Sequence, residues 1–294
     1  MNKATSKLVL GSANFGFEYG LANTSGKLAQ SELIKILALS ENAGIKYIDT
    51  AQAYGDSESR IGAMCGDGRF KIITKIGLDL ENSFVKNNVS GLVQKSCEAL
   101  NEVRLYAVLL HHPEVLLGDH GKTIIRELSV LKEKNIIAKI GVSIYSPEIL
   151  GAISKLFKLD IVQAPFNIFD QKMSSSGWSD KLKANEVEIH TRSVFLQGLL
   201  LINRSQLSTY FSKNWPDLFD AWYKYLKDNN SKALNVALNF ALKQDWIDKV
   251  VVGVDNVSQL RALLEVEKFS SSLNFPQLSC DDPNLINPSR WNFT

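Results

Sequence analysis

The chain has 294 residues, of which 45% are hydrophobic and 22% charged, and its formal net charge is +2. These values are typical of a soluble globular protein, and without a basic stripe we expect no nucleic-acid partner. No apolar run approaches the ~20 residues that span a bilayer, and the polar start of the chain shows no signal peptide. The three cysteines, Cys65, Cys97 and Cys280, form no metal-ligand pattern, which favours reduced thiols. We therefore expect a cytoplasmic protein with no membrane partner and no bound metal.

Short runs rich in β-branched residues and leucine alternate with longer helical patterns along the chain. The expected strands are residues 7–10, 46–49, 71–76, 107–111, 137–142, 161–164, 188–194 and 249–252. The expected helices are residues 30–43, 58–65, 85–102, 121–133, 147–157, 178–184, 231–243 and 257–267. In the first helix, apolar residues recur at the i, i+3, i+4 spacing of one buried face.

This alternation predicts a fold of the α/β class. About eight strand–helix units in just under three hundred residues is the size of a (β/α)₈ TIM barrel, here as a single domain over residues 1–294. A doubly wound sheet is the alternative, but no G-x-G-x-x-G follows the first strand. Residues 201–230, an insertion with several aromatic residues, and the tail, residues 270–294, fall outside the alternation. Either could line a substrate pocket or simply cap the core.

Proton-handling or charged side chains stand at the ends of three expected strands. Asp49 and His111 end their strands, Lys75 is next to last in its strand, and Tyr54 follows Asp49 in a glycine-containing loop. Each alone has a structural explanation, such as a solvated strand end or a helix cap. Because barrel enzymes take catalytic residues from the carboxyl ends of different strands, the four together predict an active site.

The run from Asp49 to Glu58, D-T-A-x-x-Y-G-x-S-E, resembles the catalytic motif of the aldo/keto reductases. That resemblance implies that Tyr54 donates a proton to the substrate, and that the Lys75 ammonium beside it favours the phenolate. Asp49 would hold Lys75 in place. His111 would orient the substrate carbonyl and stabilise the oxyanion. His111, and not His112, matches the family's catalytic histidine, because in the family one variable residue separates that histidine from the proline.

The resemblance extends over nearly the whole chain and implies a nicotinamide cofactor. Ser143 and Gln163 would hold the nicotinamide carboxamide, while Arg192 stands where the family has an aromatic residue that stacks on the ring. The other cofactor-binding residues implied are Ala13, Asn14, Asp49, Ser193, Gln197, Gly198, Gly253, Asp255 and Gln259. The chain departs from the family pattern at Ala13, at Ile144 and at Arg192.

Most of the family prefers NADPH, which is therefore the expected cofactor, with NADH a close alternative. Asp255 would repel the 2′-phosphate of NADPH and accept hydrogen bonds from a free ribose; alternatively, it caps the helix that begins near Val257. Residues 17–26 resemble a bacterial branch of the family associated with surface polysaccharides and sugar metabolism. This analogy favours a sugar-like aldehyde or ketone as the small-molecule substrate.

Two other functions remain open from the sequence. A barrel lyase could use Lys75 as a Schiff-base nucleophile, which borohydride trapping would reveal. A nicotinamide-binding sensor or partner subunit could retain the four residues with very slow turnover. The sequence leaves the physiological substrate and the oligomeric state open.

Overall fold

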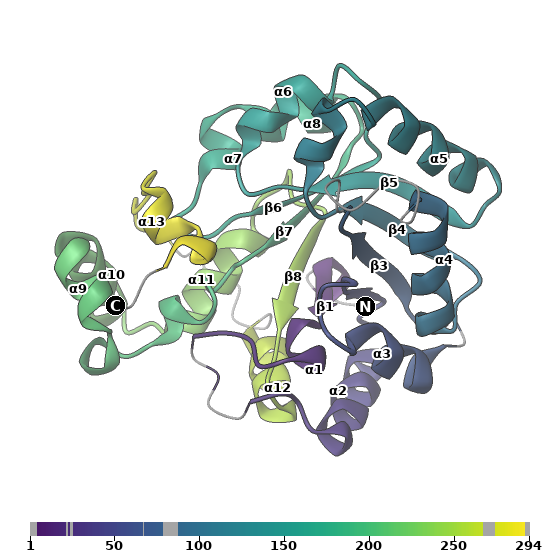
Figure 1. Ribbon diagram of the computed structural model, residues 1–294. Helices are drawn as coiled ribbons and strands as arrows, with labels where there is room; N and C mark the ends of the chain where they lie inside the picture. Colours follow the sequence, from purple (N-terminus) through teal and green to yellow (C-terminus); the bar gives the residue numbers. More distant parts are fainter. Residues whose placement is uncertain are drawn as a thin grey trace.

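Eight parallel strands close into a barrel in the order in which they occur in the chain, and helices surround it (Figure 1). The computed structural model describes residues 5–21, 23, 26–66, 68–78, 88–266 and 274–291. The strands are β1 Leu8–Gly11, β2 Tyr47–Asp49, β3 Lys71–Ile76, β4 Leu105–Leu110, β5 Ile137–Ser143, β6 Ile161–Pro165, β7 Glu188–Arg192 and β8 Lys249–Gly253. The predicted single-domain (β/α)₈ barrel is confirmed.

Helices surround the barrel. They are α1 Ala13–Gly16, α2 Gln30–Asn42, α3 Ser57–Cys65, α4 Val89–Leu100, α5 Gly121–Glu133, α6 Leu150–Ile153, α7 Lys172–Ser175, α8 Trp178–Ala184, α9 Thr209–Asn214, α10 Pro216–Asp228, α11 Ala233–Leu242, α12 Val257–Val266 and α13 Pro283–Ile286. Of these, α1 to α11 lie between successive strands in the chain, and α12 and α13 follow the last strand. A large apolar core includes buried residues of both these helices and the strands. Burial of that apolar surface stabilises the fold.

Several expected elements are shorter in the structure than the sequence predicted, among them one strand and one helix with a clear local reason or form. The strand expected over residues 188–194 ends at Arg192, because Ser193 adopts a left-handed backbone with φ 60°. The helix expected over residues 147–157 is a 3-10 turn, Pro147–Ile149, followed by the short α6. Residues 85–87 and 267, the ends of two other expected helices, lie outside the described residues.

The insertion, residues 201–230, forms α9 and α10, which lie beside α13 on one flank of the barrel (Figure 1). The Trp215 indole donates to Asp282 Oδ2 at 3.2 Å, which ties α10 to the tail. Trp222, fully buried, donates through Nε1 to the Leu200 carbonyl at 3.3 Å. These bonds fix the insertion against the tail and against the segment that follows β7.

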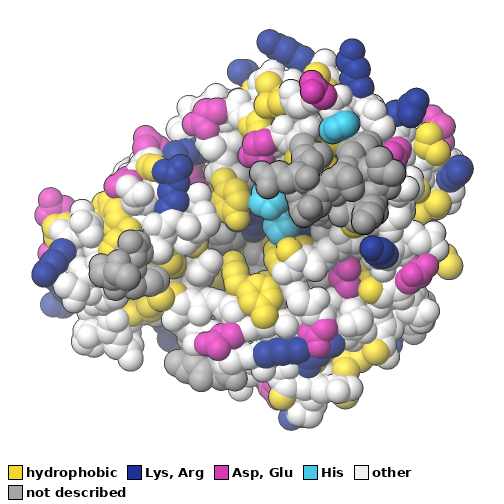
Figure 2. Space-filling view, viewed as in Figure 1, with side chains coloured by type: hydrophobic (Ala, Val, Ile, Leu, Met, Phe, Trp, Pro, Cys, Tyr) yellow, Lys and Arg dark blue, Asp and Glu magenta, His cyan; other side chains and the backbone are white. Residues whose placement is uncertain are grey.

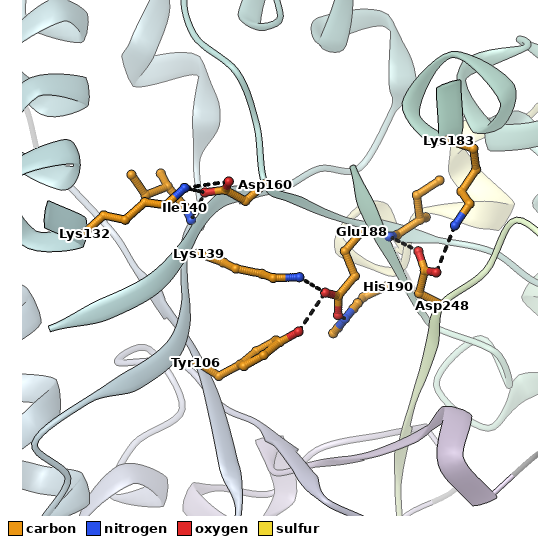
Figure 3. Close-up of polar contacts among 10 residues, drawn as sticks. Tyr106, Lys132, Lys139, Ile140, Asp160, Lys183, Glu188, His190 and Asp248 are labelled. Atoms are coloured by element: carbon orange, nitrogen blue, oxygen red, sulfur yellow. Dashed lines mark hydrogen bonds and ion pairs between the residues drawn. The ribbon is translucent and has the colours of Figure 1, made fainter. Parts of the chain in front are cut away.

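A polar layer occupies the amino-terminal half of the barrel strands. Glu188, the first residue of β7, accepts hydrogen bonds from His190 Nε2 at 2.5 Å and from the Tyr106 hydroxyl at 2.7 Å, and it pairs with Lys139 (Figure 3). Burial raises the pKa of Glu188, but its bonds to His190, Lys139 and Tyr106 outweigh burial and lower it to about 2. Glu188 therefore stays ionised as the shared acceptor of this layer.

Candidate functional site

A buried ion pair joins the ends of β2 and β3. Lys75 Nζ lies 2.5 Å from Asp49 Oδ2 and donates to the Thr50 carbonyl at 3.0 Å, and the Lys75 side chain is only 1% exposed. Burial lowers the pKa of Lys75, but the Asp49 carboxylate outweighs it and the pKa is raised. Lys75 is therefore a protonated cation. Since a Schiff-base nucleophile must be unprotonated, this pairing argues against the lyase alternative.

The loop that carries Tyr54 fits flush against α1 through two glycines. A Cβ at Gly16 would lie 1.6 Å from the Tyr54 carbonyl oxygen, so no larger residue fits there. Gly55 has φ 57°, and a Cβ on it would lie 2.6 Å from the Gly16 carbonyl oxygen. This close approach places the Tyr54 ring with its centroid 5.0 Å from Lys75 Nζ.

His111 lies beside Tyr54, directly after β4. The two ring centroids are 6.1 Å apart in an edge-to-face arrangement, and the His111 ring stacks on His112 at 5.3 Å. Burial, followed by the charge of Lys75, lowers the pKa of His111 to about 4. The imidazole is therefore neutral near pH 7 and offers one N–H donor and one acceptor nitrogen.

Gln163 of β6 lies against the other oxygen of Asp49. Its Nε2 donates to Asp49 Oδ1 at 2.6 Å, and Ser143 is its register partner on β5. Gln163 is fully buried, and its Oε1 has no hydrogen-bond partner in the described structure. A buried carbonyl without a donor costs free energy, so this atom is suited to an amide N–H from a ligand.

A cavity of about 620 Å³ opens next to these residues. Of the residues predicted to bind substrate or cofactor, those that line it are Ala13, Asn14, Asp49, Tyr54, Arg192, Ser193, Gln197, Gly198, Gly253, Asp255 and Gln259. Lys75, His111, Ser143 and Gln163 are not among the lining residues. Lys75 and Gln163 both bind Asp49, which lines the cavity, and the His111 ring packs against that of Tyr54, which also lines it.

Other cavity residues were not assigned to the site from the sequence. Tyr19, whose hydroxyl accepts from Gln197 Nε2 at 3.4 Å, lines one wall, and Arg204, Tyr223 and Lys232 line another part. The aromatic content of the insertion was the one signal for Tyr223. Nothing local in the sequence marks Arg204, which lies in the insertion, or Lys232, which lies just after it, because only the folded chain brings them to the cavity.

Asp255 faces the cavity and is held by neighbouring side chains. Its carboxylate accepts from Asn14 Nδ2 at 3.1 Å and from Gln259 Nε2 at 3.3 Å. The first amides of α12 bond elsewhere, that of Val257 to Glu32 Oε1 at 2.8 Å and that of Gln259 to Asn256 Oδ1 at 2.9 Å. Asn256 and Glu32, and not Asp255, therefore cap this helix.

Histidine side chains lie beside hydrophobic ones near the middle of the face shown in Figure 2. Phe17 and Tyr19 are more than one third exposed, with ring centroids 5.7 Å apart, and Phe17 also lies 6.1 Å from Tyr54. An aromatic surface therefore adjoins the Tyr54 ring.

A sequence model of the Aldo/keto reductase family matches residues 7–274. The chain belongs to the aldo/keto reductase family. It is 26% identical over 306 residues to D-arabinose 1-dehydrogenase of Saccharomyces cerevisiae, covering 96% of this chain and 89% of that protein. It is also 23% identical to an uncharacterized oxidoreductase of Bacillus subtilis, YqkF, over 83% of this chain and 85% of that one.

Solved structures share the fold. An aldo-keto reductase from Bacillus halodurans, in its holo form, has a TM-score of 0.69 at 18% identity over 91% of this chain and 88% of that one. Glycerol dehydrogenase from Gluconobacter oxydans has a TM-score of 0.69 at 20% identity, covering 91% of this chain and 87% of that one. As an aldo/keto reductase, the chain is an oxidoreductase of a family that uses nicotinamide cofactors. Within the part of the chain that the structure describes, no helix is long and apolar enough to cross a membrane.

Proposed function

We propose that this protein interconverts a sugar-like carbonyl compound and its alcohol with a nicotinamide cofactor, and that Tyr54 is the general acid in reduction. The observation that carries the proposal is the fully buried Asp49–Lys75 pair, with its ammonium 5.0 Å from the Tyr54 ring. A tyrosine with only a structural role in a loop does not require a buried ammonium beside it. A buried cation directly beside a phenol is an arrangement that assists proton transfer.

The residues around the cavity fit a nicotinamide dinucleotide. The unpartnered Oε1 of Gln163 would accept from the carboxamide, with Ser143 next to it. Ser193, Gln197 and Gly198 would contact the phosphates, Ala13 and Asn14 would line the wall opposite, and Gly253, Asp255 and Gln259 would receive the adenosine end. When bound, the nicotinamide supplies or accepts the hydride.

The protein's own groups handle the proton and the developing charge. Tyr54 would donate its phenolic proton to the carbonyl oxygen, and Lys75, fixed by Asp49, would stabilise the phenolate that remains. His111, neutral because its pKa is lowered to about 4, would direct an N–H at the same oxygen without competing as a charged acid. In alcohol oxidation the same groups act in reverse.

The nature of the substrate is supported by two observations. The relatives include proteins named D-arabinose 1-dehydrogenase and glycerol dehydrogenase, both named for polyhydroxylated compounds. Phe17 and Tyr19 give the site an exposed aromatic wall next to Tyr54, which suits the apolar face of a sugar ring. From the insertion, Leu201, Arg204 and Tyr223 would add to the cavity wall.

We keep NADPH as the proposed cofactor, with NADH a close alternative. Lys232 lines the cavity, is exposed and makes no ion pair among the described residues, so its ammonium can bind the 2′-phosphate of NADPH. The negative charge of Asp255, which also lines the cavity, would repel the same phosphate.

Asp255→Ser should shift the ratio of the NADPH and NADH dissociation constants several-fold in favour of NADPH, because a like-charge contact at a partly exposed site costs roughly 1 kcal/mol. Titration of both cofactors into the wild type and the variant measures this ratio. An unchanged ratio would mean that Asp255 does not face the 2′ position.

The activity itself is tested by following absorbance at 340 nm with aldoses, ketoses and polyols, in both directions and with both cofactors. We expect turnover with at least one polyhydroxylated compound. Tight cofactor binding with no turnover on any of these would instead favour a sensor or partner subunit. Absence of binding by either cofactor would overturn the proposal.

A further inference from the structure

Arg192 is a cation at the reactive end of the cavity. It is the last residue of β7, is half-buried, and lines the cavity together with Asp49 and Tyr54. Its Nη2 donates to the Ile144 carbonyl at 3.0 Å and its Nη1 to Ser193 Oγ at 3.3 Å. Its guanidinium carbon lies 4.5 Å from the centroid of the Tyr145 ring. The plane of the side chain is thereby fixed.

The charge of Arg192 is not neutralised by an adjacent carboxylate. Its hydrogen-bond acceptors are a carbonyl and a hydroxyl, and within the described residues it forms no ion pair. Of the other charged groups nearby, Lys75 is balanced by Asp49, and His111 is neutral. Burial raises the pKa of Asp170 to about 6 and the charge of Arg192 counteracts this, but among the described residues no hydrogen bond or ion pair joins Asp170 to Arg192. Arg192 therefore presents to the reactive end of the cavity a positive charge that no adjacent carboxylate of the described residues neutralises.

The barrel register places this cation beside the site proposed for the nicotinamide. Gln163, whose Oε1 would hold the carboxamide, pairs with His190 on β7, and Pro165 pairs with Arg192. Arg192 therefore lies two residues further toward the carboxyl end than Gln163, on the neighbouring strand. A ring anchored at Gln163 would therefore be held on the strand next to the one that carries the guanidinium, in the cavity that Arg192 and Tyr54 both line.

We propose that Arg192 makes the site discriminate between the two redox forms of its cofactor, binding the reduced form more tightly than the oxidised form. The oxidised nicotinamide ring carries a positive charge, and the reduced ring is neutral. Like charges a few ångströms apart, partly screened by solvent, repel by enough to change a dissociation constant about tenfold. The inference rests on the proposed function, because it requires a nicotinamide in this cavity. Its consequence is that the oxidised cofactor leaves more readily than the reduced one.

The test measures the dissociation constants of the oxidised and the reduced cofactor for the wild type, Arg192→Gln and Arg192→Lys. We expect the ratio of oxidised to reduced constants to fall about tenfold in Arg192→Gln, which loses the charge but keeps a planar, hydrogen-bonding group. Arg192→Lys keeps the charge and should retain the wild-type ratio within a factor of about three. Arg192→Tyr provides a second uncharged variant if the glutamine variant does not fold.

Lys232→Gln is the matched control, because it removes a cavity cation away from the reactive end. It should weaken both forms equally and leave the ratio unchanged. An unchanged ratio in both uncharged variants, with both cofactor forms still bound, would overturn the role of Arg192 alone. If neither form binds the wild type, the proposed function fails, and this inference fails with it.

Discussion

At the scale of single residues, the charged groups of the site are held by a chain of side-chain contacts. Lys75 is a fully buried cation with one carboxylate partner, Asp49, and Asp49 is held in turn by Gln163. Tyr54 and His111 complete the group from separate loops. Because each group depends on the next, removing the tyrosine hydroxyl and removing the lysine should have different effects.

Tyr54→Phe should keep cofactor affinity and lose most carbonyl reduction. It deletes only the phenolic proton, and a positioned acid typically contributes about 10²–10⁴-fold in rate. Steady-state rates and cofactor titrations on the variant check this, with Tyr19→Phe as a control that removes the hydroxyl of a different tyrosine lining the cavity. Retention of more than about a third of wild-type activity would show that Tyr54 is not the acid.

Lys75→Met should abolish activity and also lower the free energy of unfolding. Removing one partner of a buried ion pair leaves an uncompensated charge, here on Asp49, and typically costs about 3–5 kcal/mol. Lys224→Met is the matched control, since the Lys224–Asp228 pair is exposed and such helix pairs contribute only about 0.3–0.5 kcal/mol. Equal urea midpoints for the two variants would contradict the proposed burial of the Lys75 charge.

At the scale of elements, the site depends on how closely α1 meets the loop after β2. Gly16 and Gly55 bring the two backbones into contact, and Ser57 donates to the Ser12 carbonyl at 3.0 Å just behind them. The position of Tyr54 is thus set by backbone packing between two loops. A change distant from the tyrosine side chain should therefore still move it.

Gly16→Ala should lower both stability and activity. The added Cβ would meet the Tyr54 carbonyl oxygen, so the loop must shift; overpacking of this kind costs about 1–3 kcal/mol, and a misplaced catalytic group can lose about 10²-fold in rate. Gly118→Ala is the control, because its Cβ would meet nothing closer than 3.8 Å. Melting temperatures and rates for both variants decide the matter, and a fully active Gly16→Ala enzyme would refute the packing argument.

At the scale of the whole molecule, the two ends of the barrel have different tasks. The groups proposed for catalysis lie at the carboxyl ends of β2, β3 and β4, and the Glu188 layer lies toward the amino-terminal ends of β4, β5 and β7. In barrel enzymes the carboxyl end carries activity and the other end contributes to stability. The Glu188 layer should therefore affect folding and not catalysis.

Glu188→Gln should lower stability at neutral pH without changing the rate. The pKa of Glu188 falls from 4.5 to about 2 on folding, so its stabilisation is present above pH 4.5 and is lost as the pH falls toward 2. The shift corresponds to roughly 3 kcal/mol at pH 7. Urea unfolding of both proteins at pH 7 and near pH 3 should show a difference that narrows in acid. A difference independent of pH would rule out the ionised carboxylate as its source.

Strand positions and strand-end chemistry were predictable from the sequence, because both are encoded over a few neighbouring residues. The alternation of strands and helices predicted the barrel, and Asp49, Lys75 and His111 were recognisable where each strand ends. The fold class and family were confirmed, whereas the roles of these residues remain predictions. The family resemblance also indicated Gln163, but not that its Oε1 lacks a partner.

Only the tertiary structure decided which distant segments meet. Lys232 lines the same cavity as Ser193, although the two residues are far apart in the chain. Glu188 meets Tyr106 because closure of the barrel brings β4 and β7 within reach of each other. The early end of β7 follows from the left-handed backbone of Ser193. The sequence by itself determined the elements and the side chains at their ends, since these depend on local periodicity. Contacts between residues far apart in the chain depend on barrel closure and packing, which no local pattern contains.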